Sequence, residues 1–470
     1  MTGGRQGAPV ALGTAPGRWL VTVTVLASGM AFLDATAVQV ALPAIGRELD
    51  ASLSGLQWTV TGYTLTLAAL ILLGGSLGDR YGRRRVFVIG VVWFAVASLL
   101  CGLAQNTGQL VMARALQGVG GALLTPGSLA LIQSSFRPAD RPRAIGLWSS
   151  LSGISGLIGP FLGGLLVDTV SWRLVFLINV PFAVLIVVVA GRHVPESRDP
   201  AHHGRFDYPG AVLGAFALGG VTYALIGAGE NMLRSDVVAS AAIGVTAGVA
   251  FVLHERRATD PMLPPGLFAD SQFTGANLAT LAIYGALGGS GLFLVLQLQT
   301  VLGYDATAAG AAMLPAILLI TLLSPRAGTL AQRIGPRLPM TVGPLVVAAG
   351  TVLLAGVDGS RPYVVEVLPG SLLQGLGMAM VVAPLTATVL GAAPDALAGI
   401  ASGVNNAVAR AAQLLAVAAL PVAVGLSGDD YADPAAFTGG YRTALLMCAV
   451  LFATGGAVSW LTIRNDVLRA

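Results

Sequence analysis

Long runs of apolar residues recur along the whole chain, separated by short polar stretches. Each run is close to the ~20 residues that a helix needs to cross the hydrocarbon core of a membrane. The runs are continuous rather than alternating, so they predict helices and not the strands of a membrane barrel. Fourteen helices are expected, at residues 19–42, 57–78, 85–105, 108–133, 143–167, 172–192, 208–229, 236–254, 273–301, 307–325, 338–356, 363–390, 399–425 and 441–463.

The composition agrees with a surface that faces lipid. Of the 470 residues, 55% are hydrophobic and 10% are charged, whereas a soluble domain carries roughly 25% charged residues. The polar residues before Trp19 lead into a full-length apolar run, which predicts a retained helix rather than a cleaved signal peptide. Cys101 and Cys448 both fall in apolar runs. That position favours packing over a disulfide, and we expect no metal site.

The positions of the charges predict how the chain is oriented. All 26 basic residues are arginines, and the absence of lysine excludes the phosphate-binding loop of nucleotide-driven pumps. Nineteen arginines fall in the tails and loops on the side of the termini. Seven do not: Arg47, Arg173, Arg234, Arg361 and Arg442 at the opposite helix ends, and Arg114 and Arg410 inside helices. Because positive loops stay in the cytoplasm, both termini are expected there, in a multi-pass protein of the cell membrane. Arginines spread over short loops do not indicate nucleic-acid binding.

Two short patterns occur twice, which indicates an internal repeat. Gly75–Gly82 reads GSLGDRYG, and Gly328–Gly335 reads GTLAQRIG, 253 residues later. LQGVG at 116–120 returns as LQGLG at 373–377, 257 residues later. Six helices need only ~190 residues, so the repeat leaves space for an inserted helix pair. The expected layout is a six-helix bundle at 1–197, a linker with two inserted helices at 198–268 and a second six-helix bundle at 269–470. Parallel halves place the substrate path between them.

Several motifs in the first half carry a resemblance to a known family. The loop from Gly75 to Arg85 resembles the signature loop of the major facilitator superfamily, and GISGLIGPFLGG at 153–164 resembles its antiporter motif. Three further patterns narrow the resemblance to one family within this superfamily: LDATAVQVALP at 33–43, RALQGVGG at 114–121 and WRLVFLINVP at 172–181. With fourteen helices, the chain looks like the drug:proton antiporters of multidrug efflux. The resemblance implies the major facilitator fold, an all-α integral membrane structure.

The loop after the second helix has two interpretations. The resemblance implies a cytoplasmic gate in which Asp79 binds a facing helix N-terminus or arginine in one conformation and releases it in the other. The alternative is that the arginines only set topology. The second copy of the loop has Gln332 in place of the acid. The gate residues are Gly75, Gly78, Asp79, Arg80, Gly82, Arg83 and Arg84.

The fifth helix is rich in glycine, which allows neighbouring helices to approach closely. Pro160 removes a backbone hydrogen bond and can bend the helix. Plain helix packing explains this pattern, and the resemblance adds a hinge or seal between the two halves. The residues are Gly153, Gly156, Gly159, Pro160, Gly163 and Gly164.

Asp34 and Arg114 are the most informative residues of the chain, because charges inside membrane helices are costly and usually functional. Asp34 lies ~13 Å before Pro43 and Arg114 ~8 Å past Gln109, so both fall in the outer half of the membrane. Burial opposes ionisation of the acid and a nearby arginine favours it. A balance between them would suit proton coupling. The alternative is a static ion pair that fixes helix packing.

Other polar and aromatic residues inside the helices are expected to line a central cavity. Arg410, with Asn405 and Asn406 one turn before it, forms a second polar site that either contacts substrate or pairs with backbone carbonyls. The candidates are Gln39, Tyr63, Asn277, Tyr284, Gln297, Asn405, Asn406 and Arg410.

These observations predict a monomeric secondary transporter that exchanges protons for small hydrophobic compounds across the lipid bilayer, with no cofactor besides the proton. An alternative cargo is a lipid or an endogenous secondary metabolite, as in self-resistance of a producing organism. The arginine-only, alanine- and glycine-rich composition resembles that of GC-rich bacteria. An intramembrane enzyme is not expected, since the helices hold no nucleophile–base set. A receptor is not expected either, because no loop is long enough for a signalling domain.

Overall fold

A computed structural model describes residues 10–137, 140–197, 207–394, 397–427, 430 and 433–466. The side chains at 72, 79, 142, 149, 150, 157, 398 and 399 also lie outside the described part. The described residues are helical apart from their connections and contain no β-strand, only an isolated bridge between Val10 and Phe136. Thirteen helical segments in this part are long and apolar enough to cross a membrane. A further helix, α2 (Leu53–Tyr81), has 29 residues. Together they account for the fourteen spans expected from the sequence.

The first half of the chain contains α1 to α7. Their bounds are α1 (Ala15–Leu49), α2 (Leu53–Tyr81), α3 (Arg83–Gly102), α4 (Thr107–Ser135), α5 (Arg141–Thr169), α6 (Arg173–Leu177) and α7 (Asn179–His193). The middle of the chain forms α8 (Tyr208–Asn231) and α9 (Ser235–Glu255). The second half contains η1 (Pro265–Ala269), α10 (Ser271–Leu296), η2 (Gln297–Val301), α11 (Ala306–Ile334), α12 (Arg337–Leu354), α13 (Tyr363–Glu366), α14 (Leu368–Gly391), α15 (Ala398–Ala423) and α16 (Pro434–Thr462).

Polar side chains define where many of the long helices begin. Each accepts a hydrogen bond from a backbone N–H in the first turn, where no carbonyl of the helix is available. The capping residues are Thr14, Ser52, Asn106, Asp207, Asp270, Asp305 and Asp433.

Two of the expected helices are interrupted by proline. The helix expected at 172–192 is divided into α6 and α7, and the one at 363–390 into α13 and α14. Pro181 and Pro369 lie just after the two breaks. Proline has no N–H to donate, and its ring excludes the carbonyl four residues earlier. Each division therefore follows from the local sequence.

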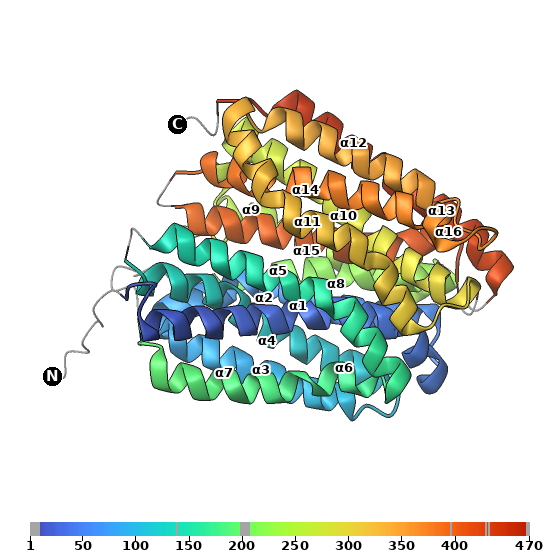
Figure 1. Cartoon of the computed structure of the whole chain (residues 1–470), viewed down its shortest axis with the longest axis horizontal. Helices are drawn as coiled ribbons and strands as arrows, with labels where there is room; N and C mark the ends of the chain where they lie inside the picture. The colour runs from blue at the N-terminus through green and yellow to red at the C-terminus, as the bar shows by residue number, and fades with distance from the viewer. Residues whose placement is uncertain are drawn as a thin grey trace.

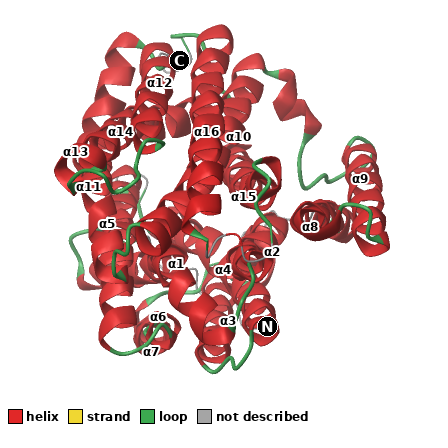
Figure 2. Cartoon of the chain, turned by 90° about the vertical axis from the view of Figure 1, so that its right-hand side faces the viewer, coloured by secondary structure: helices red, strands yellow, loops and turns green. Residues whose placement is uncertain are grey.

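The start of α1 and the end of α16 lie at the same end of the molecule in Figure 1, which we call the terminal end. The other end is called the opposite end. Figure 2 shows α8 and α9 at the side of the molecule, apart from most of the other helices. Of these two, α8 contacts α2 and α15. Ser54 Oγ donates to Glu230 at 2.8 Å, and the rings of Trp58 and Tyr223 lie 5.9 Å apart between centroids.

The two halves of the chain meet closely at the opposite end, through α5 and α11. A Cβ added at Gly164 would collide with the Ala306 carbonyl, and one added at Gly310 with the Pro160 carbonyl. Toward the terminal end the two helices diverge (Figure 1), and a Cβ at Gly153 would meet nothing within 4 Å. The seam between the halves is therefore closed at the opposite end, and α5 and α11 separate toward the terminal end.

Candidate functional site

Asp34 of α1 and Arg114 of α4 form a buried ion pair. The Arg114 Nη1 lies 2.6 Å from Asp34 Oδ2, and the two side chains are 2% and 0% exposed, respectively. Arg114 Nε donates to the Thr59 carbonyl of α2 at 3.0 Å. Its guanidinium carbon lies 4.5 Å from the centre of the Tyr63 ring. The arginine is thus held by a carboxylate, a carbonyl and an aromatic face.

Amide side chains complete the surroundings of Asp34. Gln117 Nε2 donates to Asp34 Oδ1 at 2.8 Å, and its Oε1 accepts from Arg114 at 2.5 Å. Asn179 Nδ2 donates to the same Asp34 oxygen at 3.1 Å. Both amides also donate to Ser98 Oγ of α3. The Asp34 carboxylate thus accepts hydrogen bonds from Arg114, Gln117 and Asn179, and all of these partners are donors.

The site is built from five helices of the first half, α1, α2, α3, α4 and α7. Sequence reasoning named Asp34 and Arg114 and expected Tyr63 to line the cavity. Tyr63 is instead buried against Arg114. Sequence reasoning did not single out Gln117, Asn179 or Ser98. The available signal was the spacing of three between Arg114 and Gln117, which puts both on one helix face.

The antiporter motif of α5 connects this site to the second half. Gly159 faces Leu33 and Thr36 of α1, and a Cβ at Gly163 would lie 2.7 Å from the Ala37 Cβ. These α1 residues flank Asp34. The residues that directly follow these two glycines, Pro160 and Gly164, face the first turns of α11. The first two glycines of the motif differ. A Cβ added at Gly153 would meet nothing within 4 Å, and one added at Gly156 would meet only Phe32, at 4.0 Å.

Asp168 adds a polar contact where α5 meets α11. Its carboxylate accepts from the Ala306 N–H at 3.2 Å, from the Thr307 N–H at 2.7 Å and from the Thr307 hydroxyl at 2.6 Å. Negative charge at a helix N-terminus is favourable because the first N–H groups lack partners. Asp168 therefore fastens the two halves at the opposite end, a contact that sequence reasoning did not identify.

The candidate gate loop lies at the terminal end, between α2 and α3. Gly82 joins the helices with φ 110°, a conformation that L side chains rarely adopt. An acid does bind a helix N-terminus here, but it is Glu196, from the segment after α7. Its carboxylate accepts from the N–H groups of Arg84 and Arg85 at 3.1 and 3.2 Å. The side chain of Asp79 lies outside the described part. Within the rest of the motif, Gly78 faces Arg83, and Gly75 faces Pro126.

The remaining cavity candidates separate into two groups. Gln297 is fully buried and donates to the Val357 carbonyl at 2.9 Å, and Asn277 is buried next to Asn405, whose Nδ2 donates to it at 3.2 Å. These three hold the second half together in this conformation. Four others also keep exposed surface, as Asn405 does: Gln39, Tyr284, Asn406 and Arg410.

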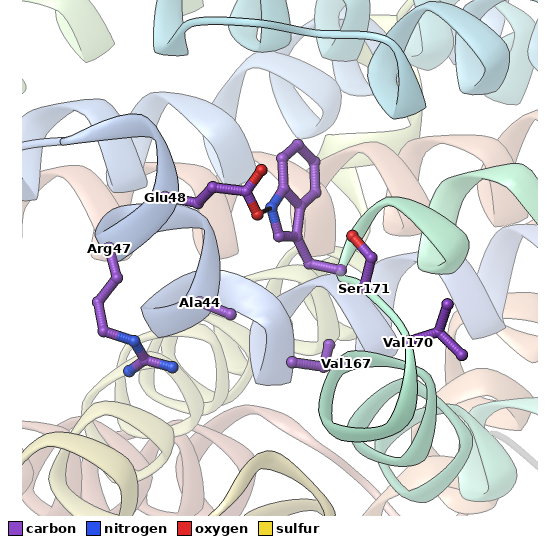
Figure 3. A pocket seen from close by; sticks show the side chains of 7 residues that line it. Ala44, Arg47, Glu48, Val167, Val170 and Ser171 are labelled. Atoms are coloured by element: carbon purple, nitrogen blue, oxygen red, sulfur yellow. Dashed lines mark hydrogen bonds between the residues drawn. The ribbon is translucent and has the colours of Figure 1, made fainter.

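A surface pocket lies at the opposite end, at the end of α1 and the end of α5 (Figure 3). Trp172 Nε1 donates to Glu48 Oε2 at 2.7 Å, and Arg173 forms an ion pair with Glu48. These bonds fasten the end of α1 to the start of α6. The pocket is lined by Ala44, Arg47, Glu48, Val167, Val170, Ser171 and Trp172. All of these belong to the first half, and the pocket is a feature of packing at its surface.

Comparisons with known proteins agree with this architecture. A family model described as Major Facilitator Superfamily matches residues 24–417. The puromycin resistance protein pur8 of Streptomyces alboniger is 36% identical, and the match covers 96% of this chain and 93% of that protein. The multidrug resistance protein Stp of Mycobacterium tuberculosis (strain CDC 1551 / Oshkosh) is 36% identical, and the match covers 82% of this chain and 72% of that protein.

Among solved structures, the fold is similar to a bacterial homolog of the human lysosomal transporter Spinster, in an inward-facing and occupied conformation. The TM-score is 0.68, and the match covers 96% of this chain and 97% of that chain. The sequences are only 14% identical, so the likeness concerns the fold alone.

Proposed function

Because this chain belongs to the major facilitator superfamily, we propose that it exports small hydrophobic or amphiphilic compounds, including antibiotics, in exchange for protons. Its resistance relatives support the cargo. The single observation that supports proton coupling is the fully buried Asp34, held by Arg114, Gln117 and Asn179. A buried carboxylate of this kind in a membrane protein is a site for proton binding or charge pairing.

The proton cycle follows from the two states of Asp34. In the described conformation the Asp34 carboxylate is paired with Arg114, and α5 and α11 separate toward the terminal end, as expected after a proton has been released on that side. Protonation would remove the charge that holds the Arg114 guanidinium. Arg114 would then keep the Thr59 carbonyl, Gln117 and the face of Tyr63 as partners. The pair therefore has a second arrangement that does not leave the cation without contacts.

Helix α5 would transmit this change to the second half. The α1 residues on either side of Asp34 pack against Gly159 and Gly163, and the residues that follow these glycines in the same turns, Pro160 and Gly164, pack against α11. A shift of α1 would therefore press on the contact that closes the opposite end. Pro160, which cannot donate a backbone hydrogen bond, lies in the stretch of α5 that contacts both α1 and α11.

The orientation and surroundings belong to the same proposal. By sequence, nineteen of the 26 arginines fall in tails and loops on the side of the termini, so this side would face the cytoplasm of the cell. Compounds would enter from the cytoplasm or the inner leaflet and leave on the other side. The working unit would be a monomer in the bilayer, with the proton in place of a cofactor. It would carry out transport and no chemical reaction.

A resistance profile tests the proposal. The chain is expressed in an efflux-deficient host, and growth is measured across a panel of antibiotics that includes puromycin, with and without a protonophore. We expect raised resistance to some hydrophobic compounds and lower cell accumulation that the protonophore reverses. The Asp34→Asn variant, matched for membrane expression, serves as the control. Unchanged resistance and accumulation across the panel would contradict the drug-export proposal and favour a lipid or an endogenous metabolite.

A further inference from the structure

Arg410 of α15 is a charge inside a membrane helix without an acidic partner in the described part of the chain. The only hydrogen bond of its side chain there joins Nη1 to Gln413 Oε1, on the same helix, at 3.4 Å. A guanidinium has five N–H donors, and a cation in a low-dielectric interior is costly unless it is paired. Asp34, the one acid that the sequence places deep in the membrane, is already engaged by Arg114. Arg410 thus has unused capacity for an anion.

The position of Arg410 follows from the contact between α2 and α15. Gln57 of α2 donates to the Val417 carbonyl of α15 at 2.8 Å. From that contact Tyr63 lies six residues toward the terminal end on α2, and Arg410 lies seven residues toward the same end on α15. Gly285 and Gly288 of α10, which follow Tyr284, pack against Ala412 and Gln413 of α15. Arg410 therefore lies at the seam between the halves, at the depth of the Asp34 site.

The face of α15 that holds Arg410 becomes more accessible along its length. Residues 406, 410, 413 and 417 follow one another at helical spacings of three and four, so they share this face. Val417 is buried at the contact with Gln57, Gln413 and Arg410 are half-buried, and Asn406 is exposed. Accessibility thus increases steadily from Val417 toward the terminal end.

We propose that Arg410 is the binding site for an anionic group on the exported compound. The planar fork of arginine matches a carboxylate, and donors in a partly buried site bind it more strongly than in water. Asn406 and Gln413 add amide groups on the same face, and Tyr284 adds an aromatic surface from α10. The substrate class is a hydrophobic compound that carries a carboxylate or a comparably acidic oxygen. This inference rests on the proposed function, because it names the cargo of that transporter.

The test compares two probes that differ in charge. Pyrene-1-butyrate is an anion at pH 7.4, and pyrene-1-butyramide is its neutral counterpart with the same apolar body. Binding to purified full-length protein in nanodiscs is measured by fluorescence, and the signal of empty nanodiscs is subtracted. We expect the wild type to bind the carboxylate ~10-fold more tightly than the amide, the usual effect of one charge-assisted contact.

Three variants assign the preference. Arg410→Gln is expected to lose the preference through weaker binding of the carboxylate, with amide binding unchanged. Arg410→Lys is expected to keep part of it, because the charge remains and the fork is lost. Arg442→Gln removes an exposed charge on α16 at the opposite end and should behave as the wild type. If Arg410→Gln does not fold, Arg410→Lys takes its place. A smaller preference for the carboxylate in Arg410→Lys than in the wild type would then support the anion site, and an equal preference would contradict it.

Two results would overturn the inference: no preference in the wild type, or a preference that survives Arg410→Gln. Binding in nanodiscs needs no gradient, so it is independent of the proposed function. Uptake of both probes by energised everted vesicles tests that function separately. Equal uptake of the two probes by the wild type and Arg410→Gln would keep the exporter and reject the anion site. A binding preference without any energised uptake would keep the site and reject the exporter.

Discussion

Asp34→Asn is the substitution that most directly separates proton coupling from helix packing. Asparagine keeps the size of the side chain and one carbonyl oxygen, so the bonds from Gln117 and Asn179 can persist. The amide that replaces the second oxygen would face the Arg114 guanidinium, now at 2.6 Å from a carboxylate oxygen. Breaking a buried pair in this way costs about 3–5 kcal/mol in the free energy of unfolding.

The lower end of that range applies here, because Arg114 would keep three partners. The Thr59 carbonyl and Gln117 Oε1 accept from it, and the Tyr63 ring offers a cation–π contact at 4.5 Å. We therefore expect a stability loss of about 3 kcal/mol. A double variant, Asp34→Asn with Arg114→Gln, removes both charges and should recover part of this loss.

Two measurements on the same preparations decide between the interpretations. Thermal unfolding in nanodiscs gives stability. The initial rate of uptake driven by an imposed pH gradient in proteoliposomes, per folded molecule, gives coupling. The cargo is the compound with the largest protonophore-sensitive resistance. We expect both variants to lose gradient-driven uptake, although the double variant is more stable than the single one. If the double variant recovers stability and gradient-driven uptake together, the pair is structural and another group carries the proton.

Three further perturbations follow from the contacts. Gly163→Leu should lower the free energy of unfolding by about 1–3 kcal/mol and slow transport, because its side chain would collide with α1. Gly153→Leu, at an open position, should be neutral in unfolding and transport assays, and equal effects of the two variants would reject close packing of α5 on α1. Asp168→Asn should loosen the N-terminus of α11 and increase thiol labelling of a cysteine placed at the opposite end of the seam; unchanged labelling would mean that Asp168 does not help to close that end. Burial by itself would raise the pKa of Asp207, but the Gly210 N–H and the His254 ring hold the pKa below its usual value. Asp207→Ala should therefore lower the free energy of unfolding by about 1 kcal/mol at pH 7. The difference in stability from the wild type should shrink below pH ~4, where the carboxyl becomes protonated first in the unfolded and then in the folded state. A stability difference that does not change with pH would reject this role of Asp207.

The sequence predicts the helices well because the membrane imposes one length and one composition on each of them. It also places Asp34 and Arg114 at a common depth, and the structure pairs them, while their role in coupling stays a prediction. It does not reveal Gln117 or Asn179 as partners, because an amide in an apolar helix can face a neighbour, a cavity or its own backbone. The same uncertainty explains Gln297, which was expected at the cavity and is buried against the Val357 carbonyl.

The acid at the gate loop is a different case. Sequence reasoning looked for a helix N-terminus near Asp79, because that acid belongs to the motif. The α3 N-terminus is instead bound by Glu196, which lies more than one hundred residues later in a linker without a motif. Which acid reaches a helix N-terminus depends on how the chain returns to it. Only the packing of α7 beside α3 brings Glu196 there, so no local pattern could have identified it.

We propose Asp34 as the proton site and Arg410 as a cargo site, so the two must communicate through helices that contact both halves. Asp34 and its partners all belong to the first half, while Arg410 belongs to the second. Two helices of the first half offer such a route. Helix α2 holds Tyr63 beside Arg114 and contacts α15 through Gln57, and α5 touches α1 at Gly159 and Gly163 and α11 at Gly164. A side chain at any of these three glycines would hold α5 away from its neighbours. The absence of side chains on this part of α5 would therefore let a movement of α1 reach α11 directly.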